Sequence, residues 1–314
     1  MTTSVPRRVS VIIGTRDRPA LLREALASIR ALEGEDLTFE ILVGDNGATP
    51  ETADVVAEFG GIYAKTDKNG CAAARNLAMR RATGDFIAFL DDDDVWLKGH
   101  IRPHIAFLDA NPDYEAAFGQ IVCTDAQRQT LGEPWPAKLP PDGDVFDVML
   151  SGYFPQVGGS VFRGNAIAKY GLMDESLIGD SDWDWQLRVA RNGRVGFIDT
   201  PCVLFRQRDP GSFDQLQLTR QKYTKRIFRR HAFLSRERPF QRLGASRIYR
   251  AYAGAVWQYF DYFCTHAVQR SKSGDFEGAR YALFSAFLTL PHVATARFVS
   301  TPELRAAVLA SMSA

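Results

Sequence analysis

Hydrophobic and polar positions alternate along the first 110 residues in a pattern that predicts strands separated by helices. Residues 8–15 form an apolar run typical of a buried strand, and Pro19 begins a stretch with apolar residues at helical spacing. Further strands are predicted at 39–47, 60–66 and 85–90, each preceded by a helical segment. Four strands alternating with three helices indicate an α/β fold with a parallel, Rossmann-like central sheet flanked by helices.

The pattern changes along the rest of the chain. Residues 114–125 and 195–206 are typical of strands, and a helix is predicted between them at 181–192, ended by Gly193. From about Ser212 the pattern is mostly helical, which predicts a helical C-terminal extension. In this extension one helix face gathers apolar and aromatic side chains, and core packing is its simplest interpretation; pairing of two subunits and contact with a membrane stay open. The face consists of Tyr249, Tyr252, Val256, Tyr259, Phe260 and Phe263.

Composition narrows the class of protein. The 314 residues are 46% hydrophobic and 24% charged, as in an ordinary globular protein, with a formal net charge of +1. No apolar run approaches a membrane span, no secretory signal is evident, and four scattered cysteines favour a cytoplasmic location. His100 and His104 are four residues apart, but Pro103 between them favours a structural or surface role over a metal site.

Charge is unevenly distributed. Residues 206–250 hold thirteen Lys or Arg against three Asp or Glu. Within them, residues 220–230 are predicted either to be a solvated helix face or to contact anionic lipid headgroups on the inner face of a membrane as a peripheral partner. Nucleic acid is not expected as a partner, because no recognition motif accompanies this charge.

Polar clusters follow three of the predicted strands. They are Gly14–Asp17, Gly44–Gly47 and Asp91–Asp94. Ligands of open α/β sheets bind outside the carboxyl ends of the strands, so these clusters are expected to share one rim of the sheet.

Four consecutive aspartates at the end of a core strand need compensation. Two carboxylates about 4 Å apart repel by roughly 4 kcal/mol at an effective dielectric near 20, and a hard divalent cation is a common remedy. Mg²⁺ or Mn²⁺ bound by few protein ligands would keep positions for the phosphate oxygens of a nucleotide. The alternative is a solvated turn in which Asp94 caps a helix beginning at Val95.

Several motifs, in their order along the chain, resemble family 2 glycosyltransferases of the GT-A fold. The motifs are VSVIIGTRDRPALLREALASI, ILVGDNG, NGCAAARNLAMRRATGDFIAFLDDDDVW and DSDWDWQLRVARNG. The resemblance implies a GT-A glycosyltransferase domain over residues 1–212, followed by the helical extension at 213–314. Within the domain, residues 1–110 would be the nucleotide-binding half and residues 111–212 the acceptor-side half.

The resemblance also implies which residues contact the nucleotide-sugar. Asp45 would contact the base or ribose, and Asp92 a ribose or sugar hydroxyl. Asp93 would be the main metal ligand, with Asp91 beside it both as a second metal ligand and as a nucleotide-sugar contact. The other implied nucleotide-sugar contacts are Thr15, Arg16, Asp17, Arg75 and Asn76.

Inverting sugar transfer needs a carboxylate that accepts the proton of the acceptor hydroxyl. By resemblance, Asp182 is the candidate base. Asp180 and Asp184 are alternatives, and Asp180 and Asp182 could instead cap the helix. The same comparison places Arg208 where relatives often have a histidine near the diphosphate. Trp183 and Trp185 would be diphosphate or acceptor contacts, although tryptophan on a helix is more often in the core.

The resulting hypothesis is an inverting transferase of the hexosyltransferase type, acting in bacterial polysaccharide or glycoconjugate synthesis. Its donor would be a UDP-sugar and its acceptor a hydroxyl of a glycan or lipid-linked molecule. One alternative is a sugar-1-phosphate nucleotidyltransferase, although the glycine-rich run expected before its Gly-Thr-Arg turn is absent. Another is a non-catalytic nucleotide-sugar-binding scaffold. A homo-oligomer is compatible with the sequence.

Overall fold

The computed structural model describes residues 6–207, 213–234 and 245–313. The chain divides into two compact units. Unit 1 comprises residues 1–149 and 154–213, and unit 2 comprises residues 150–153 and 214–314. Among the residues described, no helix combines the length and the apolar character needed to cross a lipid bilayer.

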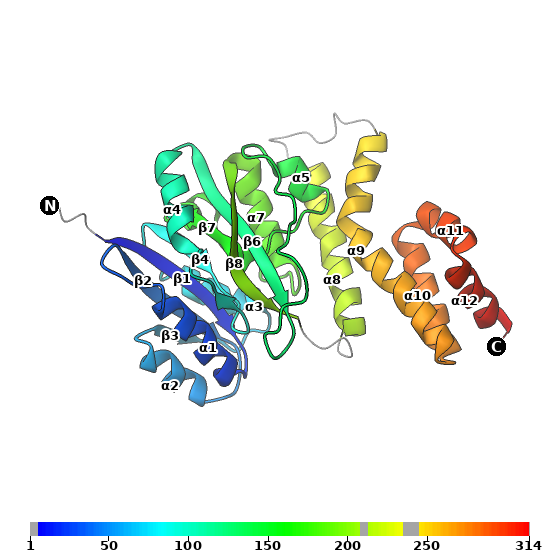
Figure 1. Ribbon diagram of the computed structural model, residues 1–314, viewed down its shortest axis with the longest axis horizontal. Coiled ribbons are helices and arrows are strands. Elements are labelled where there is room, and N and C mark those ends of the chain that lie inside the picture. The colour runs from blue at the N-terminus through cyan, green and yellow to red at the C-terminus, as the bar shows by residue number, and fades with distance from the viewer. Residues whose placement is uncertain (1–5, 208–212, 235–244, 314) are drawn as a thin grey trace. The chain divides into compact units, whose positions relative to one another are not determined.

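Unit 1 is built on one mixed sheet with the strand order β3-β2-β1-β4-β7-β6-β8-β5. Helices flank this sheet (Figure 1). The strands are β1 (Arg7–Thr15), β2 (Leu37–Asp45), β3 (Ile62–Lys65), β4 (Phe86–Phe89), β5 (Val95–Trp96), β6 (Tyr114–Thr124), β7 (Ser160–Arg163) and β8 (Arg194–Arg206). The helices are α1 (Pro19–Arg30), α2 (Glu51–Glu58), α3 (Cys71–Met79), α4 (Ile101–Ala110), α5 (Phe146–Leu150), α6 (Ala166–Tyr170) and α7 (Ser181–Asn192), with a 3₁₀ turn η1 (Val157–Gly159).

The first half of unit 1 confirms the predicted alternation of strands and helices. β1 lies between β2 and β4 and is parallel to both, and β2 is parallel to β3. The second half joins this parallel core through antiparallel pairing of β7 with β4 and with β6. The sheet is therefore mostly parallel where the polar clusters follow the strands, and mixed beyond it.

The core follows from the apolar runs of the strands. β1 is buried on both faces from Val9 onward, as expected of a central strand covered by helices. α1 places Leu22, Leu26 and Ile29 against the sheet at helical spacing, and Pro19 at its first turn needs no backbone partner. This burial holds the carboxyl ends of the strands in fixed positions.

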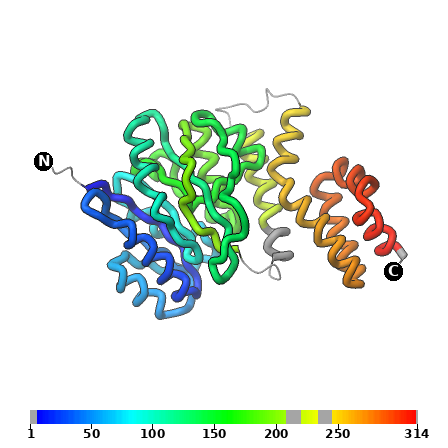
Figure 2. The backbone as a smooth tube through the Cα atoms, in the orientation of Figure 1, coloured from blue at the N-terminus to red at the C-terminus, as the bar shows by residue number. Residues whose placement is uncertain are grey.

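Unit 2 is helical, in agreement with the predicted character of the extension. It contains α8 (Phe213–Arg229), a π-helical turn η3 (Arg230–Leu234), α9 (Ala245–Lys272), α10 (Phe276–Thr289), α11 (Pro291–Ser300) and α12 (Pro302–Ser313). Figure 2 traces the last four as consecutive helices, yellow to red, joined by short turns. Val256, Tyr259, Phe260 and Phe263 of α9 lie in the core of this unit, which confirms core packing for most of the aromatic face, whereas Tyr249 is exposed.

One close approach in unit 1 generates a prediction. A Cβ on Gly44 of β2 would lie 1.8 Å from the backbone oxygen of Ala74 in α3. We expect Gly44→Ala to lower the free energy of unfolding by about 3 kcal/mol or more, because backbone cannot move aside as a side chain can. Thermal and urea unfolding measure this effect. Gly159→Ala is the matched control, since its nearest contact is an ordinary 3.4 Å; equal destabilisation of the two variants would contradict the prediction.

Candidate active site

The polar ends of three parallel strands meet at one rim of the sheet, as predicted. Thr15 at the end of β1 pairs in register with Asp45 at the end of β2. On the other side of β1, Ile12 pairs with Phe89, after which β4 runs into the four aspartates. The rim therefore brings together residues that are up to 77 positions apart in the chain.

Asp92 and Asp93 are both held by one arginine. The Arg18 guanidinium makes two hydrogen bonds to the Asp92 carboxylate, and its Nη1 donates to Asp93 Oδ2 over 2.6 Å. Thr15 Oγ1 donates to Asp92 Oδ2 over 2.6 Å. Arg18 therefore acts as an internal counter-cation for two buried carboxylates.

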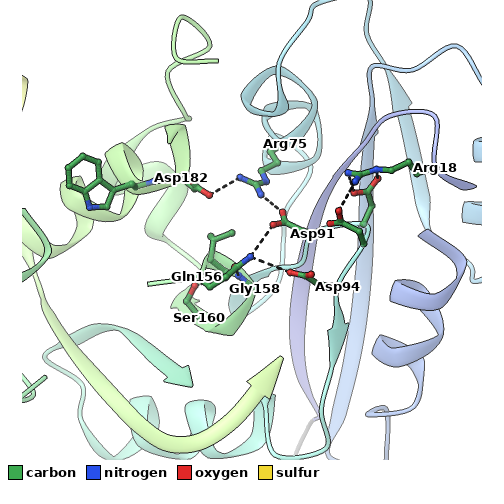
Figure 3. A network of polar contacts seen from close by, with 12 residues as sticks. Arg18, Arg75, Asp91, Asp94, Gln156, Gly158, Ser160 and Asp182 are labelled. Atoms are coloured by element: carbon green, nitrogen blue, oxygen red, sulfur yellow. Dashed lines mark hydrogen bonds and ion pairs between the residues drawn. The ribbon is translucent and has the colours of Figure 1, made fainter. Parts of the chain in front are cut away.

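Asp91 points the other way and contacts a second arginine (Figure 3). The guanidinium of Arg75, on α3, pairs with Asp91 Oδ1, and its Nη1 lies 3.5 Å from Asp182 Oδ2 at the start of α7. Arg75 is only 4% exposed, so it is a buried cation rather than a surface arginine. It links the aspartate turn to the carboxylate predicted to be the base.

Asp94 does not cap a helix. β5 follows it, because Val95 and Trp96 pair with Leu204 and Val203 of β8. The next helix, α4, begins at Ile101. The Asp94 carboxylate instead accepts hydrogen bonds from the Arg206 backbone N at 2.9 Å and from Gln156 Nε2 at 3.2 Å. Gln156 Nε2 also reaches Asp91 Oδ2 at 3.1 Å, so one amide joins the two outer aspartates.

The cluster retains an excess of negative charge. Burial raises the pKa of Asp92 to about 6, although the charge of Arg18 opposes that rise. Burial and the neighbouring charge of Asp91 raise the pKa of Asp94 well above its ordinary value. Both effects have the same cause, which is that carboxylates held together away from water disfavour the ionised form. A cation bound beside these carboxylates would stabilise their ionised forms and lower their pKa values.

Asp45 and Asp17 shape the neighbouring part of the rim. Asp45 is buried and accepts hydrogen bonds from the Gly47 backbone N at 2.7 Å and from the Tyr63 hydroxyl at 2.8 Å. Asp17, at a positive φ of 55°, accepts two backbone N–H groups and the Thr49 hydroxyl, which ties the β1 turn to the β2 turn. These hydrogen bonds, led by the one from the Ala48 N–H, lower the pKa of Asp17.

Arg16 and Asn76 have very different surroundings. The Arg16 side chain is 61% exposed, and its nearest acid is Asp17 at 3.8 Å. Asn76 is buried, and its amide bonds the backbone of Met173 in both directions and Glu175 Oε1, each at 2.9 Å. Asn76 therefore fastens α3 to the loop that precedes α7.

The three acids at the start of α7 differ in accessibility. The Asp182 side chain is 34% exposed, and its Oδ1 accepts the Trp183 backbone N–H at 2.9 Å. Asp180 and Asp184 are 8% and 1% exposed, and the Asp180 side chain makes no capping hydrogen bond. Of the three, Asp182 is the most exposed to solvent.

The two tryptophans of α7 are buried. Trp183 stacks on Phe154 with ring centroids 4.2 Å apart, and only 2% of the residue is exposed. Trp185 has no exposed surface and packs against Phe89 and Phe162, so the structure places it in the core rather than at a ligand contact. Arg208 lies outside the described residues.

Arg18 and Gln156 were not among the site residues predicted from the sequence. Arg18 directly follows the first polar cluster, at a strand end that was already assigned to the ligand rim, and this position was the signal that could have identified it. Gln156 carried no comparable signal, because its partners lie 62 and 65 residues earlier in the chain.

Comparisons with known proteins agree with this geometry. Residues 10–158 match the family profile described as Glycosyl transferase family 2. The chain is 27% identical over 231 residues to the glycosyltransferase YwdF of Bacillus subtilis, covering 71% of this chain and 84% of that protein. It is 28% identical over 194 residues to the glycosyltransferase MJ1057 of Methanocaldococcus jannaschii, covering 59% and 65% of the two chains.

Residues 10–158 belong to glycosyl transferase family 2.

A solved structure extends the likeness to the fold. The structure of S. aureus TarS 1–349 in complex with UDP-GlcNAc has a TM-score of 0.62 against this family 2 chain, covering 98% of it and 88% of TarS 1–349. Sequence identity is 18%, so the likeness concerns the fold. The chain thus has the GT-A fold expected from its motifs.

The rim of this glycosyltransferase fits a hard divalent cation. Its donors are carboxylate oxygens, which Mg²⁺ and Mn²⁺ prefer. Burial first, and then the neighbouring carboxylates, raise the pKa values of Asp92 and Asp94, so a cation bound here would favour their ionised forms. Asp93 and Asp91 stand on the two sides of this cluster, and each already contacts a cation.

Arg18 provides a test of this electrostatic arrangement. We expect Arg18→Gln to lower the free energy of unfolding by about 2 kcal/mol, less than for a fully buried ion pair because the side chain is 31% exposed. Chemical unfolding in chelator-treated buffer measures the loss.

The matched control for this prediction is Arg16→Gln, two residues away on a largely exposed side chain. It should leave stability within about 0.5 kcal/mol of the wild type. If the Arg16 and Arg18 variants were equally stable, Arg18 would not be the counter-cation of the cluster.

Proposed function

We propose that this protein is an inverting glycosyltransferase that moves a sugar from a UDP-sugar to a hydroxyl of a lipid-linked or polymeric acceptor. The observation that carries the proposal is the Arg75 bridge between Asp91 and Asp182. It places the carboxylates of the donor-side turn beside an accessible carboxylate on the acceptor-side helix. A transferase needs the aspartate turn for the donor and the α7 carboxylate for the acceptor in one site. A protein that only binds nucleotide needs the aspartate turn alone.

Relatives support the choice of donor and acceptor. TarS has been solved with UDP-GlcNAc and is named a poly(ribitol-phosphate) β-N-acetylglucosaminyltransferase. A Campylobacter jejuni relative, 32% identical over 122 residues, is named GalNAc(5)-diNAcBac-PP-undecaprenol beta-1,3-glucosyltransferase. That alignment covers 37% of this chain and 38% of the relative, so the acceptor class is part of the proposal.

On the donor side, the proposal assigns the rim to the nucleotide. Asp45 contacts the base or ribose. Thr15, Arg16 and Asp17, at the end of β1, contact the nucleotide-sugar beside it. Asp92 takes a ribose or sugar hydroxyl, and Arg75 lies beside the diphosphate. Asn76 contributes by holding α3 in place through Met173 and Glu175. Asp93 and Asp91 would hold Mg²⁺ or Mn²⁺, which when bound neutralises charge on the leaving diphosphate.

Asp182 performs the acid–base chemistry in this proposal. Its carboxylate accepts the proton of the acceptor hydroxyl while that oxygen forms a bond to the anomeric carbon. The bond between that carbon and the diphosphate oxygen breaks, and UDP leaves with the bonding electrons. The neighbouring Arg75 guanidinium orients the Asp182 carboxylate. The configuration at the anomeric carbon inverts because one displacement occurs.

A peripheral membrane contact is a separate part of the proposal. Within residues 220–230, Lys222, Arg226 and Arg229 are exposed on α8 at spacings of four and three residues. Such a stripe suits anionic headgroups, where each basic residue near the surface contributes about 1 kcal/mol.

Asp182→Asn tests the assignment of the base. The variant should lose at least about 100-fold in sugar transfer, because amide nitrogen cannot accept the proton, while UDP affinity changes little. The assay follows UDP release from a panel of UDP-sugars with Mn²⁺, with and without polyprenyl-diphosphate-linked acceptors. Asp180→Asn is the control and should keep transfer. Full transfer by the Asp182 variant would refute the assignment, and formation of nucleoside triphosphate from pyrophosphate would favour a nucleotidyltransferase.

Asp93→Ala tests the metal assignment. In the wild type, Mn²⁺ should strengthen UDP binding measured by calorimetry, because an ion held by Asp93 and Asp91 would offset the negative charge of the diphosphate. The variant should lose this Mn²⁺ dependence while it keeps the wild-type circular dichroism spectrum. Unchanged, Mn²⁺-dependent affinity in Asp93→Ala would show that Asp93 is not a ligand. Asp125→Ala is the matched control, because Asp125 lies in the turn that follows β6 and outside the aspartate cluster. This variant should keep the Mn²⁺ dependence.

A further inference from the structure

A second group of metal-ligating side chains lies in the core of unit 1, separate from the aspartates. His100 precedes α4, His104 lies on its first turn, and Cys202 lies on β8. All three have no exposed surface. One ligating atom from each can be chosen so that the three lie within 4.8 Å of one another.

The hydrogen bonding of His100 is incomplete. Both of its ring nitrogens are buried, and neither makes a hydrogen bond of ordinary geometry to the described residues. The nearby Gly158 carbonyl accepts the indole N–H of Trp96 at 2.9 Å and also interacts with the His100 ring. One carbonyl can pair with only one of the two ring nitrogens, so at least one buried nitrogen has no partner among the described residues. Leaving such a polar group unpaired in the interior costs about 1–3 kcal/mol.

Both ring nitrogens of His104 face carbonyl oxygens, although a neutral ring can donate only one hydrogen bond. Its Nδ1 lies 3.2 Å from the His100 carbonyl oxygen and its Nε2 lies 3.2 Å from the Gly159 carbonyl oxygen. A neutral imidazole carries one proton. Only one of the two carbonyls can accept that proton. If Nδ1 donates to His100, the Nε2 lone pair faces Gly159 O and the Cys202 thiol.

These separations approach those of a tetrahedral zinc site. Bond lengths of about 2.1 Å for Zn–N and 2.3 Å for Zn–S put a nitrogen and a sulfur ligand about 3.6 Å apart. His104 Nε2 and Cys202 Sγ are 4.0 Å apart, and Nε2 and Gly159 O are 3.2 Å apart. Gly119 leaves the space for this group, since a Cβ there would lie 2.2 Å from Cys202 Sγ and 3.1 Å from the His104 ring.

We propose that His100, His104 and Cys202 bind a structural zinc ion, with the Gly159 carbonyl oxygen completing the coordination. Zinc binding displaces the thiol proton of Cys202 to solvent during folding and leaves a thiolate ligand. The Nδ1–H of His104 stays on the His100 carbonyl, a second contact that orients the ring. Because it is buried, the ion enters as the chain folds.

The position of this zinc site gives it a role in the molecule. Gly159 ends η1, which follows Gln156, the residue that joins Asp91 and Asp94. Cys202 O accepts the Leu97 backbone N–H at 2.8 Å, just after β5. The ion therefore ties together the segments on both sides of the aspartate turn. This inference does not depend on the reaction that the enzyme catalyses.

Metal analysis of the untagged full chain tests the proposal. After purification without chelators and dialysis against metal-free buffer, we expect about one zinc per chain by inductively coupled plasma mass spectrometry. Cys202→Ser should retain less than a fifth of that zinc. Cys264→Ser is the matched control, because Cys264 is also buried but lies in unit 2, and it should retain all of it. Zinc absent from the wild type, or equal in the Cys202 and Cys264 variants, would overturn the proposal.

Cobalt provides a readout that depends on the ligands themselves. Protein refolded with Co²⁺ should show the near-ultraviolet thiolate-to-cobalt charge-transfer band and the visible bands of tetrahedral cobalt. His100→Asn keeps the thiol and should weaken Co²⁺ retention at least tenfold, which keeps the test decisive if Cys202→Ser does not fold. Refolded wild-type protein with native circular dichroism and no charge-transfer band would refute thiolate ligation.

Discussion

The pairing of the aspartates at the end of β4 with Arg18 and Arg75 is the interaction on which the candidate site depends. A core strand delivers four carboxylates to the rim, where they cannot all turn into water. Arg18 compensates Asp92 and Asp93, and Arg75 compensates Asp91. Isolated buried charge costs several kcal/mol, so these arginines are a condition for the turn to exist in this form.

The same pairing joins the two halves of unit 1. Arg75 reaches across to Asp182 on α7, and Gln156 connects Asp91 with Asp94. Asn76 fastens α3 to the loop before α7. Residues from the parallel half and from the mixed half thus share one polar network. A donor that displaces Arg75 from Asp91 would also change the contact between Arg75 and Asp182, the proposed base.

The sequence predicted the parts of this arrangement that local patterns encode. Apolar runs located the parallel strands, and the topology of a parallel sheet then placed Thr15, Asp45 and the aspartates at one rim. Partners far apart in the chain were not predictable in this way. Arg18 and Gln156 meet the aspartates only through the fold. The alternative in which Asp94 caps a helix is wrong, because Val95 and Trp96 pair with β8, more than 100 residues later, and this pairing overrides the local pattern. Trp185 followed the known tendency of helix tryptophans to be buried.

If the proposed function is correct, the aspartates that Arg18 and Arg75 hold at the rim bind the diphosphate of a nucleotide-sugar, next to Asp182. A crystal structure with Mn²⁺ and a non-hydrolysable UDP-sugar analogue tests it most directly. The claim predicts the diphosphate beside Asp91 and Asp93, the uracil near Asp45, and the anomeric carbon facing Asp182. A nucleotide bound away from this rim, with both arginine–aspartate pairs unchanged, would contradict it.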